Sequence, residues 1–76
     1  MARARFDQVD WSDKRRLDKL TRRGKHVRLI RTDGQVQQGR LTGIEATGPT
    51  TLMLHLDTPD GPVHAGVTTT GYRLVA

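Results

Sequence analysis

Apolar residues follow a helical spacing near the start of the chain and a two-residue spacing after it. Between residues 12 and 23, Leu17, Leu20 and Thr21 fall on one stripe at about 100° per residue, which predicts a short amphipathic helix. Gly24 suits a left-handed C-cap that ends this helix. Three residues at its start are candidate N-caps: Asp10, Ser12 and Asp13.

Alternation of apolar and polar residues then predicts five strands. Val27 and Leu29 point inward in the first, and a Leu-x-Leu-x-Leu run from Leu52 faces the core in the third. Asp33-Gly34 and the segment 58–61 (TPDG) are tight-turn signals that join neighbouring strands into hairpins. The expected strands cover residues 25–32, 35–45, 51–57, 63–69 and 72–76.

The second of these strands does not keep a single alternation. Val36 has one parity, Leu41 has the other, and Ile44 returns to the first, so a flat strand could not bury all three. Glycine inside a strand marks a bulge, a bend or a close backbone approach. Gly39 and Gly43 therefore predict a long strand that bends and serves both halves of a curled sheet.

The length of 76 residues indicates one small domain with a thin core. Residues 1–9 show no periodicity and are expected to form a flexible basic arm, and residues 10–76 the folded domain. A helix followed by five short strands with tight turns predicts a mostly β, small bent five-stranded barrel with an N-terminal helix. Oligomerisation is a common way for so short a chain to gain buried surface.

Positive charge is concentrated in the first part of the chain. Residues 1–31 carry eleven Lys or Arg and four Asp, a balance of +7, whereas residues 32–76 carry two Arg and four acids, a balance of −2. These balances account for the net charge of +5. The asymmetry favours a polyanionic partner at the N-terminal helix. The alternative is a solvated helix that only keeps the protein soluble.

Several classes of function are disfavoured by what the sequence contains. It has no cysteine, and its three histidines are too widely spaced for a local metal signature, so no metal or cofactor is expected. No serine nucleophile or phosphate-cradling glycine pattern is present, so an enzyme is not expected. The sequence lacks a membrane-spanning run of about 18 apolar residues and a secretory signal, which favours a cytoplasmic protein.

Two segments carry a family resemblance. Residues 24–29 (GKHVRL) and 33–45 (DGQVQQGRLTGIE) resemble the first motif of the Sm-like and Hfq-like small-barrel proteins: a strand, an Asp-Gly or Asn-Gly turn, four residues, a glycine, a hydrophobic residue and soon after it an acid. The resemblance implies a bent five-stranded barrel, a homo-oligomeric ring formed by pairing of the fourth and fifth strands, and single-stranded RNA as partner. The asparagine expected soon after Glu45 is absent, and His64 is the nearest counterpart of the second motif.

The sequence therefore predicts an RNA-binding regulator that contacts phosphates through the basic helix. Trp11 and Tyr72 are expected to pack the helix and the barrel end instead of stacking on bases. The alternative function is a small module that docks on a protein of the transcription or translation machinery through an exposed strand edge. The candidate RNA-binding residues are Lys14, Arg15, Lys19, Arg22, Arg23, Arg28, Arg31 and His64.

Overall fold

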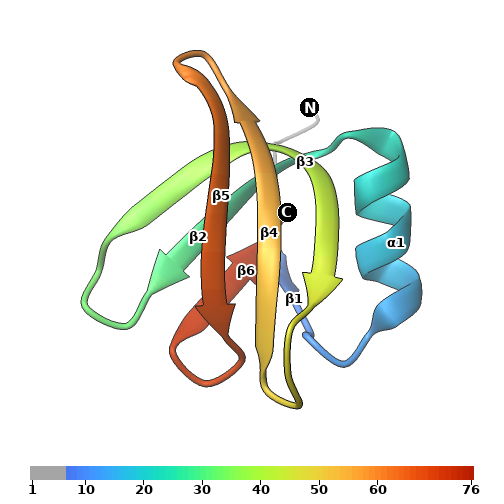
Figure 1. The fold of residues 1–76 in the computed structure, drawn as a ribbon, viewed down its shortest axis with the longest axis vertical. Coiled ribbons are helices and arrows are strands. Elements are labelled where there is room, and N and C mark those ends of the chain that lie inside the picture. The colour runs from blue at the N-terminus through green and yellow to red at the C-terminus, as the bar shows by residue number, and fades with distance from the viewer. Residues whose placement is uncertain (1–6) are drawn as a thin grey trace, which may run out of the picture.

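The computed structural model describes residues 7–76 as one helix and an antiparallel sheet of six strands (Figure 1). The elements are β1 (Gln8–Val9), α1 (Lys14–Arg23), β2 (His26–Arg31), β3 (Val36–Ala46), β4 (Thr51–Thr58), β5 (Gly61–Thr68) and β6 (Tyr72–Val75). The order in the sheet is β1-β6-β2-β3-β4-β5. The mostly β class with one short N-terminal helix is confirmed. The end strands β1 and β5 do not pair with each other, so the sheet is not closed into a barrel.

Both ends of α1 are set by capping residues. Asp13 is the N-cap, and its carboxylate accepts a hydrogen bond from the backbone N–H of Arg16 at 3.1 Å. The helix therefore begins at Lys14, two residues later than predicted. At the other end Gly24 adopts the left-handed conformation with φ of 56°, as expected. The buried face consists of Leu17 and Leu20.

Trp11 connects the start of the helix to the sheet. Its indole Nε1 donates a hydrogen bond to the carbonyl oxygen of Tyr72 at 2.9 Å, and both side chains are half-buried against the core. The prediction that both aromatic residues pack within the fold is confirmed, although Tyr72 packs against an open sheet and not at the end of a closed barrel. α1 itself packs beside β3 at one side of the sheet (Figure 1).

A short strand, β1, lies where the sequence predicted an unstructured arm. Gln8 and Val9 pair with Val75 and Leu74 of β6, and the pairing continues in two backbone hydrogen bonds between Asp7 and Ala76, of 2.9 and 3.0 Å. Two residues are too few to show an alternating pattern, which explains why this strand was missed. The rest of the predicted arm, residues 1–6, lies outside the described residues.

β3 connects the two halves of the sheet, as its glycines predicted. Its first half pairs with β2 and its second with β4, and Arg40 lies opposite His26 on one side and Asp57 on the other. The register shifts between Leu41 and Gly43, so the bulge expected near Gly43 is confirmed.

Gly39 contributes to the bend in a different way from Gly43. A Cβ atom at Gly39 would lie 2.8 Å from the backbone oxygen of Asp57, so the close approach of β4 requires glycine there. The prediction that Val36 points into the core was wrong. Its side chain is 56% exposed because it lies at the end of the β2–β3 hairpin, beyond the part of β3 that the helix and β4 cover.

The core consists of ten buried aliphatic side chains contributed by every strand and by α1. No polar or charged residue among the described ones is buried with them. They are Val9, Leu17, Leu20, Val27, Leu29, Leu41, Leu54, Leu56, Val67 and Leu74.

Val9 provides a test of whether β1 belongs to the fold. Its side chain is 2% exposed, so Val9→Ala should lower the free energy of unfolding by about 1.5–2.5 kcal/mol through lost apolar burial and a residual cavity. Val36→Ala is the matched control. It should change the free energy of unfolding by less than about 0.5 kcal/mol, because the Val36 side chain is exposed. Urea denaturation of both variants measures the difference, and equal effects would contradict a place for β1 in the core.

Candidate nucleic-acid interface

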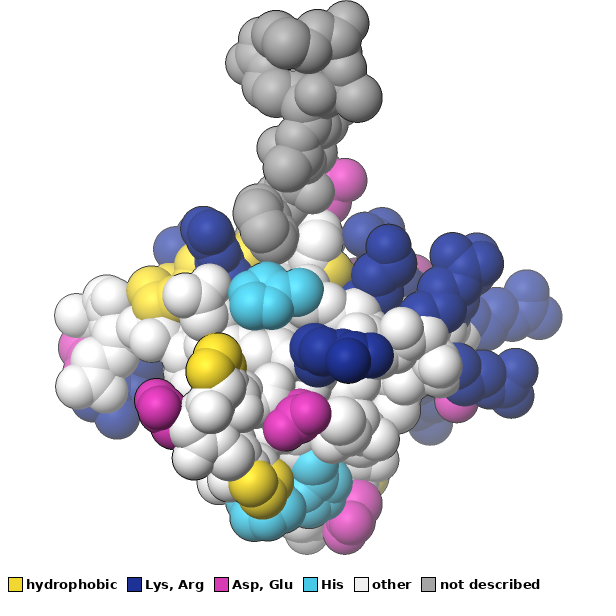
Figure 2. Space-filling view, turned by 90° about the horizontal axis from the view of Figure 1, so that it is seen from above, with side chains coloured by type: hydrophobic (Ala, Val, Ile, Leu, Met, Phe, Trp, Pro, Cys, Tyr) yellow, Lys and Arg dark blue, Asp and Glu magenta, His cyan; other side chains and the backbone are white. Residues whose placement is uncertain are grey.

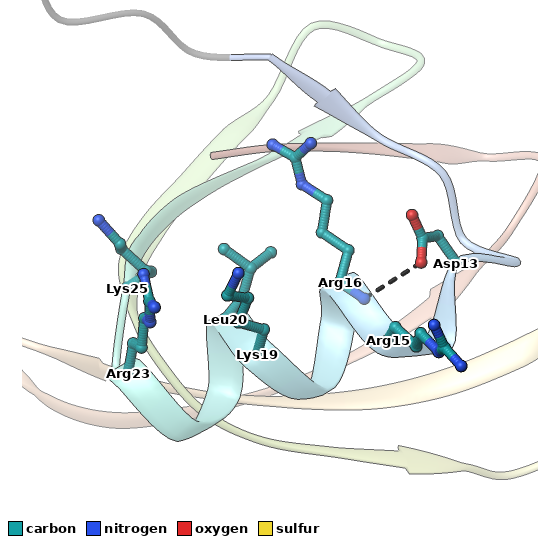
Figure 3. A pocket seen from close by; sticks show the side chains of 7 residues that line it. All are labelled: Asp13, Arg15, Arg16, Lys19, Leu20, Arg23 and Lys25. Carbon is teal, nitrogen blue, oxygen red and sulfur yellow. Dashed lines mark hydrogen bonds between the residues drawn. The ribbon is translucent and has the colours of Figure 1, made fainter.

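Five cationic side chains line one open depression on α1, which we call the basic groove (Figure 3). Its volume is about 500 Å³, and Asp13 and Leu20 complete its lining. All five cations are solvent-exposed. They are Arg15, Arg16, Lys19, Arg23 and Lys25.

Helical periodicity explains why four of these cations gather together. Leu17 and Leu20 are drawn into the core, so the basic residues between and beyond them remain on the outward surface of the helix. Arg15 and Lys19 are four residues apart, as are Lys19 and Arg23, a spacing that places side chains on the same face.

The C-terminal cap of α1 brings in the fifth cation. The backbone N–H of Gly24 donates to the carbonyl of Thr21 at 3.1 Å, and the N–H of Lys25 donates to that of Leu20 at 3.0 Å. This double capping arrangement requires the left-handed glycine and turns the chain back across the helix end. Lys25 therefore lies in the same groove as Arg23 (Figure 3), although it is outside the helix.

The charge of the groove is strongly unbalanced. Its lining holds five cations and one carboxylate, Asp13, and that carboxylate already accepts the hydrogen bond that caps the helix. The other acid of the helix, Asp18, lies outside the groove and pairs with Arg22 at 3.1 Å. In the space-filling view, Lys and Arg side chains gather on the side of the molecule where α1 lies (Figure 2).

The predicted binding residues are only partly brought together. Arg15, Lys19 and Arg23 line the basic groove. Lys14 lies on a different depression, beside Trp11 and between α1 and the ends of β3 and β4. Arg22 is occupied by its ion pair with Asp18, and Arg28 is exposed on β2.

Two members of the groove, Arg16 and Lys25, were not among the predicted site residues. Arg16 lies on the same stripe of the helix as Leu20 and Arg23, and no sequence pattern distinguished that stripe as a binding face. Lys25 was assigned to the strand that follows. Recognising Gly24 as a double C-cap would have predicted that the next residue folds back toward the helix end.

Arg31 lies at the far end of β2 and is held by the β2–β3 turn. Its Nε donates a hydrogen bond to Asp33 Oδ2 at 2.9 Å. The Arg31 guanidinium, with help from the backbone N–H of Gln35, lowers the pKa of Asp33 to about 2. The guanidinium of Arg31 is thus paired with the Asp33 carboxylate. Arg31 does not line the basic groove.

His64 is exposed on β5 and lies next to another histidine. Its Nδ1 is 2.6 Å from Nδ1 of His55 on β4, and Nε2 of His55 is 3.1 Å from Glu45 Oε1 on β3. The distance in sequence between the two histidines hid this contact. The predicted turn at residues 58–61 could have revealed it, since a hairpin that pairs Thr58 with Gly61 places His55 opposite His64.

Comparison with protein-family models, with curated proteins and with solved structures found no match to this chain. Within residues 7–76, no helix is both long enough and apolar enough to cross a membrane.

The Arg31–Asp33 contact predicts a pH-dependent term in stability. The pKa of Asp33 in the folded state lies below its ordinary value of 3.8, so this stabilisation is complete above that value and is lost as the pH falls through about 2. Arg31→Gln should move the pKa of Asp33 back toward 3.8, as measured by the carboxyl carbon shift in an NMR titration. Arg73→Gln is the control and should leave it unchanged; an unaltered pKa in Arg31→Gln would contradict the assignment.

Proposed function

We propose that this chain is a small RNA-binding regulator of the Sm-like type that contacts the phosphate backbone of single-stranded RNA through the basic groove. The observation that carries the proposal is the grouping of five exposed cations around a single, already engaged carboxylate. A surface of this kind attracts a polyanion and has no internal partners for most of its charge.

Binding at the basic groove is dominated by phosphate contacts. Each cation that neutralises a phosphate releases a condensed counterion, so affinity falls steeply with salt. Flexible Lys and Arg side chains on one helix provide no fixed set of base-reading groups, which favours binding with little sequence preference. The aromatic residues Trp11 and Tyr72 are engaged in packing, which supports contact with the backbone over base stacking.

The arrangement of the sheet supports the choice of an Sm-like protein. A helix precedes five consecutive strands, β2 to β6, which form a strongly bent antiparallel sheet with β3 as the shared strand. The resemblance in residues 24–45 implies the same succession of a helix and five strands, but in a closed barrel, whereas the end strands β1 and β5 of this sheet do not pair. RNA as the polyanion follows from the same resemblance, since the charge of the groove alone suits any nucleic acid.

Ring assembly, in contrast, requires a strand edge that β1 occupies. The resemblance implies pairing between the fourth strand of one copy and the fifth of the next, which here are β5 and β6. The outer edge of β6 pairs with Gln8 and Val9. A ring could form only if β1 left this edge, so we propose that the chain binds RNA as a single copy while β1 is in place.

A second candidate function is docking on a protein partner through β5. Among the described residues, β5 pairs only with β4, so its outer edge of eight residues presents unpaired backbone groups. Such an edge can accept a strand from a partner. This alternative uses the end of the sheet opposite to β1 in strand order, and no residue of β5 lines the basic groove.

Salt-dependent RNA binding by two charge-matched double variants tests the proposal. With fluorescein-labelled single-stranded RNA, five phosphate contacts should give a slope of log affinity against log salt of about −3.5. Lys19→Gln/Arg23→Gln should weaken binding by about tenfold or more and reduce the slope to about −2.

The control for this experiment is Arg31→Gln/Arg73→Gln, which removes two cations outside the groove. It should leave affinity close to that of the unmodified chain. Backbone amide spectra should show that all three proteins are folded, and the control should unfold at a slightly lower urea concentration because it loses the Arg31–Asp33 contact. Equal losses in both double variants would overturn the groove assignment. No RNA affinity in the unmodified chain would favour docking through β5.

Light scattering tests the role of β1 in assembly. Because two strands cannot occupy one edge, nuclease-treated protein should have the mass of a single 8.5 kDa chain at both moderate and high salt. A particle of about six or seven copies would contradict this expectation. It would show that β1 yields its place and that the ring implied by the resemblance forms.

A further inference from the structure

His55 and His64 face each other across the β4–β5 hairpin and form what we call the histidine pair. Their Nδ1 atoms are 2.6 Å apart, and the rings meet edge-on with centroids separated by 4.8 Å. Both belong to the face of the hairpin that points away from the core, since their neighbours Leu54 and Leu56 are buried. The pair has no role in the RNA binding proposed above.

Glu45 determines which nitrogen of His55 is free to bind. A carboxylate only accepts hydrogen bonds, so the 3.1 Å contact from Glu45 Oε1 requires a proton on Nε2 of His55. In the neutral ring this leaves a lone pair on Nδ1, directed at His64. A carboxylate behind one nitrogen of a histidine is the usual way in which proteins orient the other nitrogen toward a metal ion.

The backbone around His55 holds its ring in this position. The ring lies over Gly43, where a Cβ atom would be 3.1 Å from His55 Cδ2, so the absence of a side chain makes room for it. Thr42, the residue at the bulge of β3, donates a hydrogen bond from Oγ1 to the carbonyl of His55 at 3.0 Å. The His55 side chain is only 27% exposed, whereas His64 is exposed and reachable from solvent.

We propose that the two Nδ1 atoms of the histidine pair bind one divalent late transition metal ion, such as Zn²⁺, with Glu45 as the residue that positions His55. Metal–nitrogen bonds of about 2.0–2.1 Å place two ligand nitrogens roughly 2.9 Å apart at a right angle and about 3.3 Å apart in a tetrahedron. The observed 2.6 Å therefore needs a widening of only about half an ångström, which the exposed ring of His64 can supply.

The remaining ligands come from outside this cluster. Within residues 7–76 no group of three or more His, Cys, Asp or Glu side chains is arranged to hold a metal ion, so water completes the coordination. Glu45 and Asp57 lie on the same face of β3 and β4 as the histidine pair, and Arg40, opposite Asp57, is the cation of that face; Glu45, which contacts His55, is the acid nearest the pair. In Figure 2 the touching histidines have acidic side chains beside them and lie away from the Lys and Arg side chains near α1.

Titration of the full-length, untagged chain with Zn²⁺ tests the proposal, followed by calorimetry and by NMR of the histidine ring nitrogens. Zn²⁺ should shift the Nδ1 resonances of His55 and His64 and leave those of His26 in place. His64→Gln should lower Zn²⁺ affinity at least tenfold. Glu45→Gln, which keeps both ligands but removes the orienting carboxylate, should lower it about tenfold.

His26→Gln is the matched control. His26 is also exposed on a strand, but its ring nitrogen Nε2 lies 3.3 Å from Oε1 of Gln38 and not beside a second histidine. The variant should bind Zn²⁺ as the unmodified chain does. An unchanged affinity in His64→Gln, or equal shifts at His26, would overturn the site. An unchanged affinity in Glu45→Gln would overturn the positioning role. The changed side chains are exposed, so each variant should keep the fold, which backbone amide spectra verify.

Discussion

The bend of β3 is the constraint on which the rest of the structure depends. One strand must pair with β2 in its first half and with β4 in its second, so it cannot be flat. Gly39 lets the backbone of β4 approach, and the irregularity between Leu41 and Gly43 realigns the side chains so that Leu41 is buried. Gly43 has no side chain, so the ring of His55 can lie over the backbone at this bend.

The basic groove and the histidine pair occupy different parts of the molecule. The core uses only aliphatic side chains, and all the described charged groups remain at the surface, where their position follows from the element that carries them. α1 has one side in the core, so its cations gather on the other and form the basic groove. The outer face of β3, β4 and β5 carries Glu45, Asp57, Arg40 and the histidine pair. A polyanion and a metal cation would thus bind at separate surfaces.

The two ends of the sheet differ in how they are protected. β6 would be an edge strand, but β1 pairs with it and buries Val9 against the core. β5 has no such cover among the described residues, and its proline at position 62 cannot donate a hydrogen bond. A protein of this size has a small hydrophobic core. A two-residue strand that adds one buried valine to this core and covers one sheet edge therefore makes a large contribution to stability.

Local patterns in the sequence determined the helix, its glycine cap, the hairpin turns and the bulge near Gly43, because each depends on neighbouring residues and on the backbone preferences of glycine and aspartate. Only the tertiary structure decided the position of β1, the exposure of Val36 and the separation of Arg31 and His64 from the basic groove. The position of β1 depends on its pairing with β6, and that of His64 on the pairing of β5 with β4. Val36 and Arg31 lie at the end of the β2–β3 hairpin. The contact between His55 and His64 also depends on strand pairing, because two residues nine positions apart in sequence lie directly opposite each other in the β4–β5 hairpin.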